Sequence, residues 1–403
     1  MANRQAARRP PAAAMPRPER RRAAVHRRGG TLAVLLPLLT VVLLLVLAGC
    51  APRLAPVGPG LASLDLPEPG FTGSQFITAD GTALPLRRWA PPAGTAAHGV
   101  LLALHGFNDY SNAFADSGPA LAASGLEVYA YDQRGFGAAP HRGLWPGVEV
   151  LTGDLDTAAE LLHRRHPDLP LYLLGESMGG AVVLAALAGP EPPQTAGVIL
   201  AAPAVWARRT MPFHQRAALW LGARLFPWAR FSGRGLGIQA SDNIEMLRAL
   251  GRDPLFIKET RVDTIYGLVN LMDAALAAGP AVDTPALLLY GARDQVVPAE
   301  PTFQFWRSLP AEDAALQRFA FYPEGWHMLL RDLQAKVVIE DIAAWTRDPA
   351  APLPSGAEDY AAAALNRVAA GGEPEEALGA APEAAPEAAG SERAAAACEG
   401  VTC

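Results

Sequence analysis

The stretch Leu171-Tyr-Leu-Leu-Gly-Glu-Ser-Met-Gly-Gly180 carries the strongest structural signal in the chain, because it sets a serine between glycines after an apolar run. Leu171–Leu174 predicts a short buried strand and Met178–Ala188 predicts a helix. A sharp turn between the two would present the hydroxyl of Ser177 above a sheet, where glycines are needed because side chains would clash. Ser177 is therefore the candidate nucleophile.

Short apolar strands alternate with helices on both sides of this element, between residues 71 and 348. This pattern is typical of a doubly wound, mostly parallel sheet that helices cover on both faces. The predicted strands are Phe76–Thr78, Leu84–Trp89, Val100–Leu104, Leu126–Tyr131, Leu171–Leu174, Val198–Ala202, Ala286–Tyr290 and Leu316–Tyr322. The predicted helices are Ser111–Ser124, Gly153–His166, Met178–Ala188, one through Phe303–Trp306 and one from His327 to Trp345. Asp80-Gly81 predicts a hairpin turn between the first two strands.

Residues 207–283 interrupt this alternation after the sixth predicted strand and show no strand pattern. Helices are expected at Ile244–Leu250 and Leu255–Ala277. An insertion in such a sheet lies over the carboxyl ends of the strands, where ligands bind, so we expect a helical cap. Some aromatic side chains of this region must pack the cap onto the core. The candidate substrate-binding residues are Trp206, Trp220, Phe226 and Tyr266.

A serine nucleophile needs a base, and the base needs a carboxylate that orients it. Among the eight histidines, His327 is the one that directly follows the last predicted strand. Asp294 follows an apolar strand that ends at the same edge of the sheet, whereas Asp263, Asp273 and Asp283 lie in or beside the cap. The order Ser177, Asp294, His327 matches one of the known chain orders of a Ser-His-Asp triad.

The loop His105-Gly106-Phe107 follows the predicted strand Val100–Leu104. Backbone amides of Phe107 and Met178 are the candidate donors to an oxyanion, the second at the positive end of a helix. We expect His105 to brace this loop. Asp132-Gln133-Arg134 also ends a strand, but we interpret it as a turn in which Arg134 ties loops together. Asp154 is expected to cap a helix.

Six stretches together resemble the α/β-hydrolase fold, and within it the monoacylglycerol lipase / lysophospholipase group, whose domain is also labelled a serine aminopeptidase-type hydrolase. They are LHGFNDYSNAF, YDQRGFGAAP, LYLLGESMGGAVVL, VILAAPAVW, LLLYGARDQVVP and FYPEGWHMLLRD. The resemblance covers residues 71–348 and implies carboxylic ester hydrolysis without a cofactor or metal. Haloalkane dehalogenases and epoxide hydrolases share the fold but use an aspartate where Ser177 stands.

The first 49 residues have the features of an export signal. They carry nine arginines and one glutamate, followed by an apolar run from Leu32 to Leu47. Leu47-Ala48-Gly49-Cys50 resembles the bacterial lipoprotein signal, in which cleavage precedes a cysteine that becomes lipidated. We therefore expect an exported protein that lipidated Cys50 anchors to a bacterial membrane. An uncleaved N-terminal membrane anchor is the alternative.

The remaining segments are expected to be largely flexible, and the charge distribution argues against a nucleic-acid partner. Residues 50–70 are rich in proline and glycine and are expected to form a flexible tether. Residues 349–403 are rich in Ala, Glu and Pro and carry nine acids and two arginines, which predicts disorder apart from a short helix near Tyr360–Val368. Cys398 and Cys403 could form a disulfide bond in an oxidising compartment. The 403-residue chain has a net charge of −6, and no basic face for nucleic acid is apparent.

These features favour an esterase for single-chain acyl lipids such as monoacylglycerol or lysophospholipid, which reach a lipid-anchored enzyme from the membrane. An esterase for short soluble esters is the first alternative. A peptidase that releases N-terminal residues would need acidic cap side chains to hold a substrate ammonium. Those available are Glu245, Glu259, Asp263 and Asp273. A non-catalytic binding protein is disfavoured by the complete set of triad residues.

Overall fold

The computed structural model describes residues 37–38, 40–41, 52–58, 67–233, 237–310, 316–373 and 376. The chain divides into two units, Met1–Gly49 and Cys50–Cys403. Most of the predicted export signal, together with Cys50, therefore lies outside the described residues. Within the part that is described, no helix is long and apolar enough to cross a membrane.

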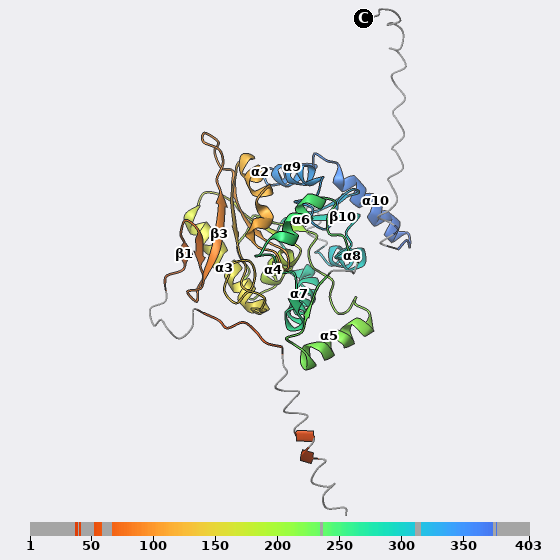
Figure 1. Ribbon diagram of the computed structural model, residues 1–403. Coiled ribbons are helices and arrows are strands. Elements are labelled where there is room, and N and C mark those ends of the chain that lie inside the picture. The colour runs from red at the N-terminus through yellow and green to blue at the C-terminus, as the bar shows by residue number, and fades with distance from the viewer. Residues whose placement is uncertain are drawn as a thin grey trace, which may run out of the picture. The chain divides into compact units, whose positions relative to one another are not determined.

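A nine-stranded sheet forms the centre of the second unit, in the order β1-β2-β3-β5-β4-β6-β7-β10-β11 (Figure 1). The strands from β5 to β11 in that order run parallel, and β1, β2 and β3 pair antiparallel at one edge. Their bounds are β1 Gly70–Phe71, β2 Gln75–Ile77, β3 Ala83–Trp89, β4 Gly99–Leu104, β5 Leu126–Tyr131, β6 Leu171–Glu176, β7 Gly197–Ala201, β10 Ala286–Gly291 and β11 Gln317–Tyr322. The mostly parallel sheet and the hairpin between β2 and β3 confirm the predictions.

Helices cover both faces of this sheet. Their bounds are η1 Ser111–Phe114, α2 Ser117–Ala123, α3 Val148–Arg165, α4 Met178–Leu187, α5 Phe213–Leu225, α6 Ile244–Arg252, α7 Val262–Ala277, η2 Gly279–Ala281, α8 Ala299–Arg307, α9 Ala335–Trp345 and α10 Ala357–Ala369. Two buried apolar clusters lie on the opposite faces of the sheet, because successive residues of each strand point to opposite sides.

The strand order places a switch point between β4 and β6. Strand β5 lies on one side of β4 and β6 on the other, so the connections that leave these strands diverge. Ligands in sheets of this kind bind in the crevice that opens where the order reverses. The loop after β4 carries Gly106 and Phe107, and the turn after β6 carries Ser177.

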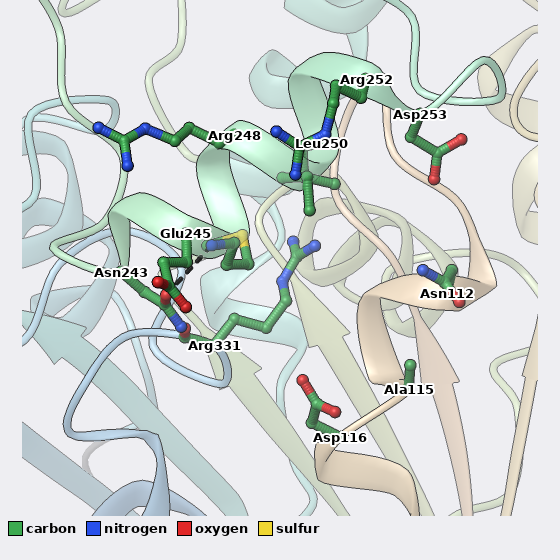
Figure 2. Close-up of a pocket in the computed structure, with 12 residues that line it drawn as sticks. Asn112, Ala115, Asp116, Asn243, Glu245, Arg248, Leu250, Arg252, Asp253 and Arg331 are labelled. Atoms are coloured by element: carbon green, nitrogen blue, oxygen red, sulfur yellow. Dashed lines mark hydrogen bonds between the residues drawn. The ribbon is translucent and has the colours of Figure 1, made fainter.

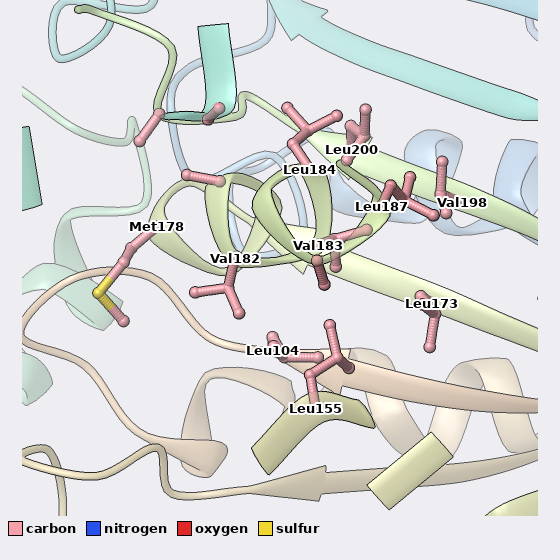
Figure 3. Close-up of a cluster of buried hydrophobic side chains, with 14 of the residues drawn as sticks. Leu104, Leu155, Leu173, Met178, Val182, Val183, Leu184, Leu187, Val198 and Leu200 are labelled. Atoms are coloured by element: carbon pink, nitrogen blue, oxygen red, sulfur yellow. The ribbon is translucent and has the colours of Figure 1, made fainter. Parts of the chain in front are cut away.

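Helix α4, which follows Ser177, is held in the centre of the molecule. Nine of its ten residues are buried. Figure 3 shows Val182, Val183 and Leu184 of α4 among apolar side chains from the strands and from α3. A helix that is apolar all round is stable only when it is enclosed, so the N-terminal end of α4 has a fixed position.

The cap inserted between β7 and β10 is mainly helical, as predicted, but it also contains two short strands. Strands β8 (Arg230–Phe231) and β9 (Thr260–Arg261) pair antiparallel, which corrects the expectation of no strand here. Helix α7 packs against α4 and carries α5 on its other side (Figure 1). The predicted helix Leu255–Ala277 begins only at Val262.

Three helix boundaries in the body also differ from the expectation. The helix expected over Ser111–Ser124 is divided into η1 and α2, because Pro119 has no N–H and is tolerated only in a first turn. Helix α3 begins at Val148, five residues before Gly153. The helix expected from His327 to Trp345 begins only at Ala335, as α9, so His327 lies in a loop and not at a helix start.

The folded body extends beyond the boundary expected at residue 348. Helix α10 packs against β11, with Ala361 and Ala364 buried in the core. The Asp341 carboxylate accepts hydrogen bonds from the backbone and hydroxyl of Ser355, and Arg318 pairs with Glu358. The predicted short helix is thus part of the domain, while residues 377–403 lie outside the described residues.

Candidate active site

Ser177 sits in a strained turn between β6 and α4. Its φ of 52° and ψ of −111° lie in a region that residues other than glycine rarely adopt. A Cβ on Gly175 would approach the Gly180 nitrogen to 2.3 Å, and one on Gly179 would approach the Leu104 carbonyl oxygen to 2.1 Å. The glycines are therefore required by close backbone contacts, as the sequence pattern indicated.

Asp294 and His327 lie in direct contact. The Nδ1 atom of His327 is 2.8 Å from Oδ2 of Asp294, although 33 residues separate them in sequence. The other carboxylate oxygen accepts hydrogen bonds from the backbone N–H groups of Val296 and Val297, which fixes its orientation. Both side chains are buried. The structure thus brings together the predicted acid and base after β10 and β11.

The charge of Asp294 determines the protonation behaviour of His327. Burial lowers the pKa of His327, but the charge and hydrogen bond of Asp294 outweigh this, so the pKa is raised above its usual value. With Nδ1 donating to Asp294, Nε2 is the nitrogen left to accept a proton. No described residue forms a hydrogen bond with Nε2.

The loop after β4 lies against Ser177. A Cβ on Gly106 would be 3.4 Å from the Cβ of Ser177. Within the described residues, the backbone amides of Phe107 and Met178 donate no hydrogen bond to another group. Two free N–H groups beside a serine can stabilise an oxyanion, which is the role that the sequence analysis expected for them.

His105 and Asn108 hold this loop in place. Nδ1 of His105 is 2.8 Å from the Gly106 carbonyl oxygen, and its Nε2 accepts from the Gln133 amide at 3.0 Å, as expected for a bracing residue. Burial lowers the pKa of His105 and keeps the ring neutral. Asn108, with φ of 66°, donates to the Thr260 hydroxyl and so joins the loop to the cap.

A buried ionic cluster behind the nucleophile was missed by the sequence analysis. Arg331 bridges Asp109 at 2.7 Å and Glu176 at 3.3 Å. Burial raises the pKa of Glu176, although the Arg331 charge opposes that change. The cluster joins the loop after β4, the residue before Ser177 and the loop of His327. The pairing could not be inferred from the sequence, because these residues are far apart along the chain.

Arg331 also borders a cavity of about 770 Å³ between α6 and the segment around η1 (Figure 2). Its guanidinium group points toward α6, whose Glu245, Arg248 and Arg252 line the cavity as well. Ser177 and His327 are not among the lining residues. The cavity therefore reaches the ionic cluster at Arg331 but is not lined by the nucleophile or the base.

Two of the four aromatic residues predicted to bind substrate share one arginine, because the guanidinium carbon of Arg224 is 4.1 Å from the Trp220 ring centroid and 5.7 Å from that of Tyr266. Trp206 is half-buried against the core, and the ring of Tyr266 lies under Arg208, whose guanidinium carbon is 4.7 Å from the ring centroid. Trp220 and Phe226 are 50% and 57% exposed on the cap. Their role in binding substrate stays a prediction.

The roles expected for Asp132 and Arg134 are confirmed, and the role expected for Asp154 is wrong. Asp132 accepts hydrogen bonds from Ser111 and from the Ala138 amide, so it stabilises loops. Arg134 binds both Asp80 and Asp154, which ties the β2–β3 hairpin to α3 as expected. Asp154 lies inside α3 and pairs with Arg134, so it does not cap the helix.

The described part of the chain contains no recognisable set of metal ligands. No group of three or more His, Cys, Asp or Glu side chains there could hold a metal ion. The arrangement of a serine in a strained turn, a histidine oriented by a buried carboxylate and two free amides is suited to acyl transfer through a covalent intermediate.

Comparison with known proteins agrees with this geometry. A family model described as serine aminopeptidase, S33, matches residues 95–334. A monoacylglycerol lipase of Mycolicibacterium smegmatis is 25% identical over 283 residues, which cover 67% of this chain and 95% of that protein. A monoglyceride lipase of Rattus norvegicus is 27% identical over 278 residues, covering 67% and 88%.

A solved structure of a soluble variant of monoglyceride lipase from Saccharomyces cerevisiae, in complex with a substrate analog, is similar in fold. Its TM-score is 0.58 at 23% sequence identity, and the match covers 74% of this chain and all of that chain. A crystal structure of the monoacylglycerol lipase of Paleococcus ferrophilus gives a TM-score of 0.54 at 22% identity, covering 65% of this chain and 98% of that one.

Proposed function

The chain belongs to the serine aminopeptidase S33 family and is a serine hydrolase with the α/β-hydrolase fold, and from this premise we propose that it hydrolyses single-chain acyl lipids such as monoacylglycerol or lysophospholipid. The observation that supports the proposal most is the buried contact of 2.8 Å between His327 and Asp294. Several curated relatives are named monoglyceride lipases, which supports a lipase or esterase over other hydrolases of the fold.

In the proposed mechanism, Ser177 attacks the acyl carbonyl while Nε2 of His327 takes the hydroxyl proton. Asp294 orients the imidazole and stabilises the cation that forms. Backbone amides of Phe107 and Met178 hold the negative oxygen of the tetrahedral intermediate, each contributing on the order of 3 kcal/mol. His327 then protonates the leaving alcohol, and water releases the acyl group by the same steps.

The preference for a long acyl chain is supported by the apolar composition of the cap. Each methylene group that leaves water gains about 0.8 kcal/mol, so chain length would increase kcat/KM until the available apolar surface is filled. Lipid anchorage through Cys50 would hold the enzyme where such substrates are found. Both the anchorage and the export of the chain to a bacterial membrane are part of this proposal.

The peptidase alternative loses support from two of the four cap carboxylates. Asp263 is buried and paired with Arg261, and Asp273 is paired with Arg208. A carboxylate that already neutralises an arginine attracts a substrate ammonium weakly. Glu245 and Glu259 line separate cavities, so they do not form one ammonium site together.

The test is to compare hydrolysis of 1-monoacylglycerol, lysophosphatidylcholine, a chain-length series of p-nitrophenyl esters and aminoacyl anilides. We expect kcat/KM to rise with acyl length and the anilides to remain intact. Ser177→Ala, checked by circular dichroism for correct folding, should lose at least about 1000-fold in turnover. Cleavage of anilides without cleavage of long-chain esters would contradict the lipid proposal.

A further inference from the structure

The cap segment that leads into α6 lies against the loop that carries His327. We call this segment, residues 239–243, the strap. The backbone N–H of Met328, the residue directly after His327, donates to the Ala240 carbonyl oxygen at 3.0 Å. Because no helix begins at His327, this N–H takes its hydrogen bond from the cap. The cap therefore contributes directly to the position of the residue that follows the base.

The strap also holds the other end of the same loop. Nδ2 of Asn243 donates to the Arg331 carbonyl oxygen at 3.0 Å, and Figure 2 shows Asn243 at the start of α6 beside Arg331. The Leu333 amide donates to Oδ1 of Asp242 at 2.9 Å. Within the loop, the Met328 carbonyl oxygen accepts from the Arg331 amide at 2.9 Å. The loop is thus a compact turn that the strap holds at both ends.

A further contact joins the strap to the loop of the acid. The Gln239 amide donates to Oε1 of Gln295 at 2.9 Å, and Gln295 directly follows Asp294. The strap therefore spans the two loops whose side chains meet in the contact of 2.8 Å between His327 and Asp294. It is itself packed into the molecule, since Ser241 at its centre is fully buried.

Asn243 makes two contacts that substitution can separate. Its Oδ1 atom accepts from the Met246 amide at 3.1 Å and caps α6, whereas its Nδ2 atom holds the Arg331 carbonyl oxygen. Serine at this position would keep an acceptor for the helix N-terminus, but its shorter side chain would not reach Arg331. The capping contact and the contact with the base loop can therefore be tested independently.

We propose that the strap positions His327 for catalysis, with Asp242 and Asn243 as positioning residues that act through the base loop. His327 lies in a loop, so the direction of its imidazole depends on Asp294 and on the backbone that the strap holds. A misplacement of about 1 Å at a reacting group can cost on the order of 100-fold in rate. The proposal rests on the mechanism proposed above, in which His327 takes the proton of Ser177.

The first test measures kcat and KM for p-nitrophenyl acetate, whose acyl group is too short to need the cap. Asp242→Ala combined with Asn243→Ser removes both side-chain contacts to the base loop. We expect kcat to fall on the order of 100-fold and KM to stay within about twofold of the wild-type value. The melting temperature should fall by only about 5 °C, so the variant is folded during the assay.

The matched control is Thr264→Val, which removes another side-chain hydrogen bond between the cap and the body. The Thr264 hydroxyl donates to the Gly143 carbonyl oxygen at 2.9 Å, and this contact does not involve the base loop. We expect kcat of this variant to equal the wild-type value. A wild-type kcat in the double variant, or an equal loss in Thr264→Val, would overturn the proposal.

Two further comparisons separate positioning from stability. Asn243→Ala loses the helix cap as well as the loop contact, so it should melt at a lower temperature than Asn243→Ser but have the same kcat. Asp242→Asn keeps an acceptor for the Leu333 amide and should restore the kcat that is lost in Asp242→Ala. If kcat instead follows the melting temperature across these variants, the strap has only a structural role and the proposal is wrong.

Proton NMR of the Nδ1–H that His327 donates to Asp294 gives a readout that a small loss of global stability does not move. We expect a resolved low-field resonance in the wild-type chain and in Thr264→Val. In the double variant it should broaden, because a base loop released from the strap lets water exchange with this proton. An unchanged resonance in the double variant would overturn the proposal, whatever its kcat.

His327→Ala, measured in the same assay, separates this proposal from the mechanism on which it rests. Wild-type kcat in His327→Ala would contradict the assignment of the base, and with it the role of the strap. Loss of activity in His327→Ala together with wild-type kcat in the double variant would overturn the role of the strap alone and leave the proposed function standing.

Discussion

At the scale of single residues, the charge of Asp294 determines when His327 can act as a base. His327 must be neutral to accept the Ser177 proton, and its pKa is raised by Asp294. Activity should therefore fall as the pH drops through this raised pKa. We expect Asp294→Asn to lower turnover on the order of 10⁴-fold, and to move the acidic limb of the kcat/KM profile to lower pH. An unchanged limb would contradict the assignment.

The charge of Arg331 compensates two buried carboxylates behind the nucleophile. Removing it with Arg331→Met leaves Asp109 and Glu176 without their cation, which should lower the free energy of unfolding by about 3 kcal/mol. Chemical denaturation measures this change. Arg248→Met, on the exposed side of α6, is the control and should change stability by less than about 0.5 kcal/mol. Equal effects of both substitutions would contradict a structural role for the cluster.

Single residues also show which parts of the site can be predicted from the sequence. Ser177, Asp294 and His327 each follow a predicted strand, so the topology that brings their strands to one edge could be inferred. Glu176 and Arg331 gave no such signal. Their pairing depends on side-chain directions and burial, which arise only once the loops after β4, β6 and β11 have folded together.

At the scale of elements, the turn between β6 and α4 depends on the absence of a single methyl group. A Cβ on Gly179 would be 2.1 Å from the Leu104 carbonyl oxygen, whereas one on Gly153 in α3 meets nothing within 4 Å. We expect Gly179→Ala to cost at least about 3 kcal/mol of stability or to prevent folding. Gly153→Ala should stabilise by about 0.5–1 kcal/mol. Thermal unfolding of both variants tests this, and similar melting temperatures would contradict the close-contact explanation.

Element boundaries were predicted well where an apolar strand or a buried helix dominated, as at β5 and α4. They failed where side chains compete with backbone hydrogen bonding. The segment after β11 reads as a helix from His327, but the Asp332 carboxylate accepts from the Trp326 and Gln334 amides and holds a loop instead. Burial raises the pKa of Asp332 to about 6.

At the scale of the whole molecule, the packing of α10 on the folded domain could not be predicted from composition. The alanine-rich, acidic sequence predicted disorder apart from a short helix near Tyr360–Val368, but Ala361 and Ala364 are small enough to let this helix pack closely on β11. Truncation after Asp348 should lower the free energy of unfolding by roughly 3 kcal/mol or more through lost apolar burial. Truncation after Glu373 should leave it unchanged. Equal stability of the two truncated chains in urea would contradict the extended domain boundary.

The central claim is that Ser177 is an activated nucleophile, and a fluorophosphonate probe tests it most directly, because only an activated serine reacts rapidly. After labelling the full chain, mass spectrometry of its peptides should find the adduct on Ser177. Labelling should be abolished in Ser177→Ala and strongly slowed in His327→Ala. An adduct on another residue, or labelling that persists in Ser177→Ala, would contradict the account.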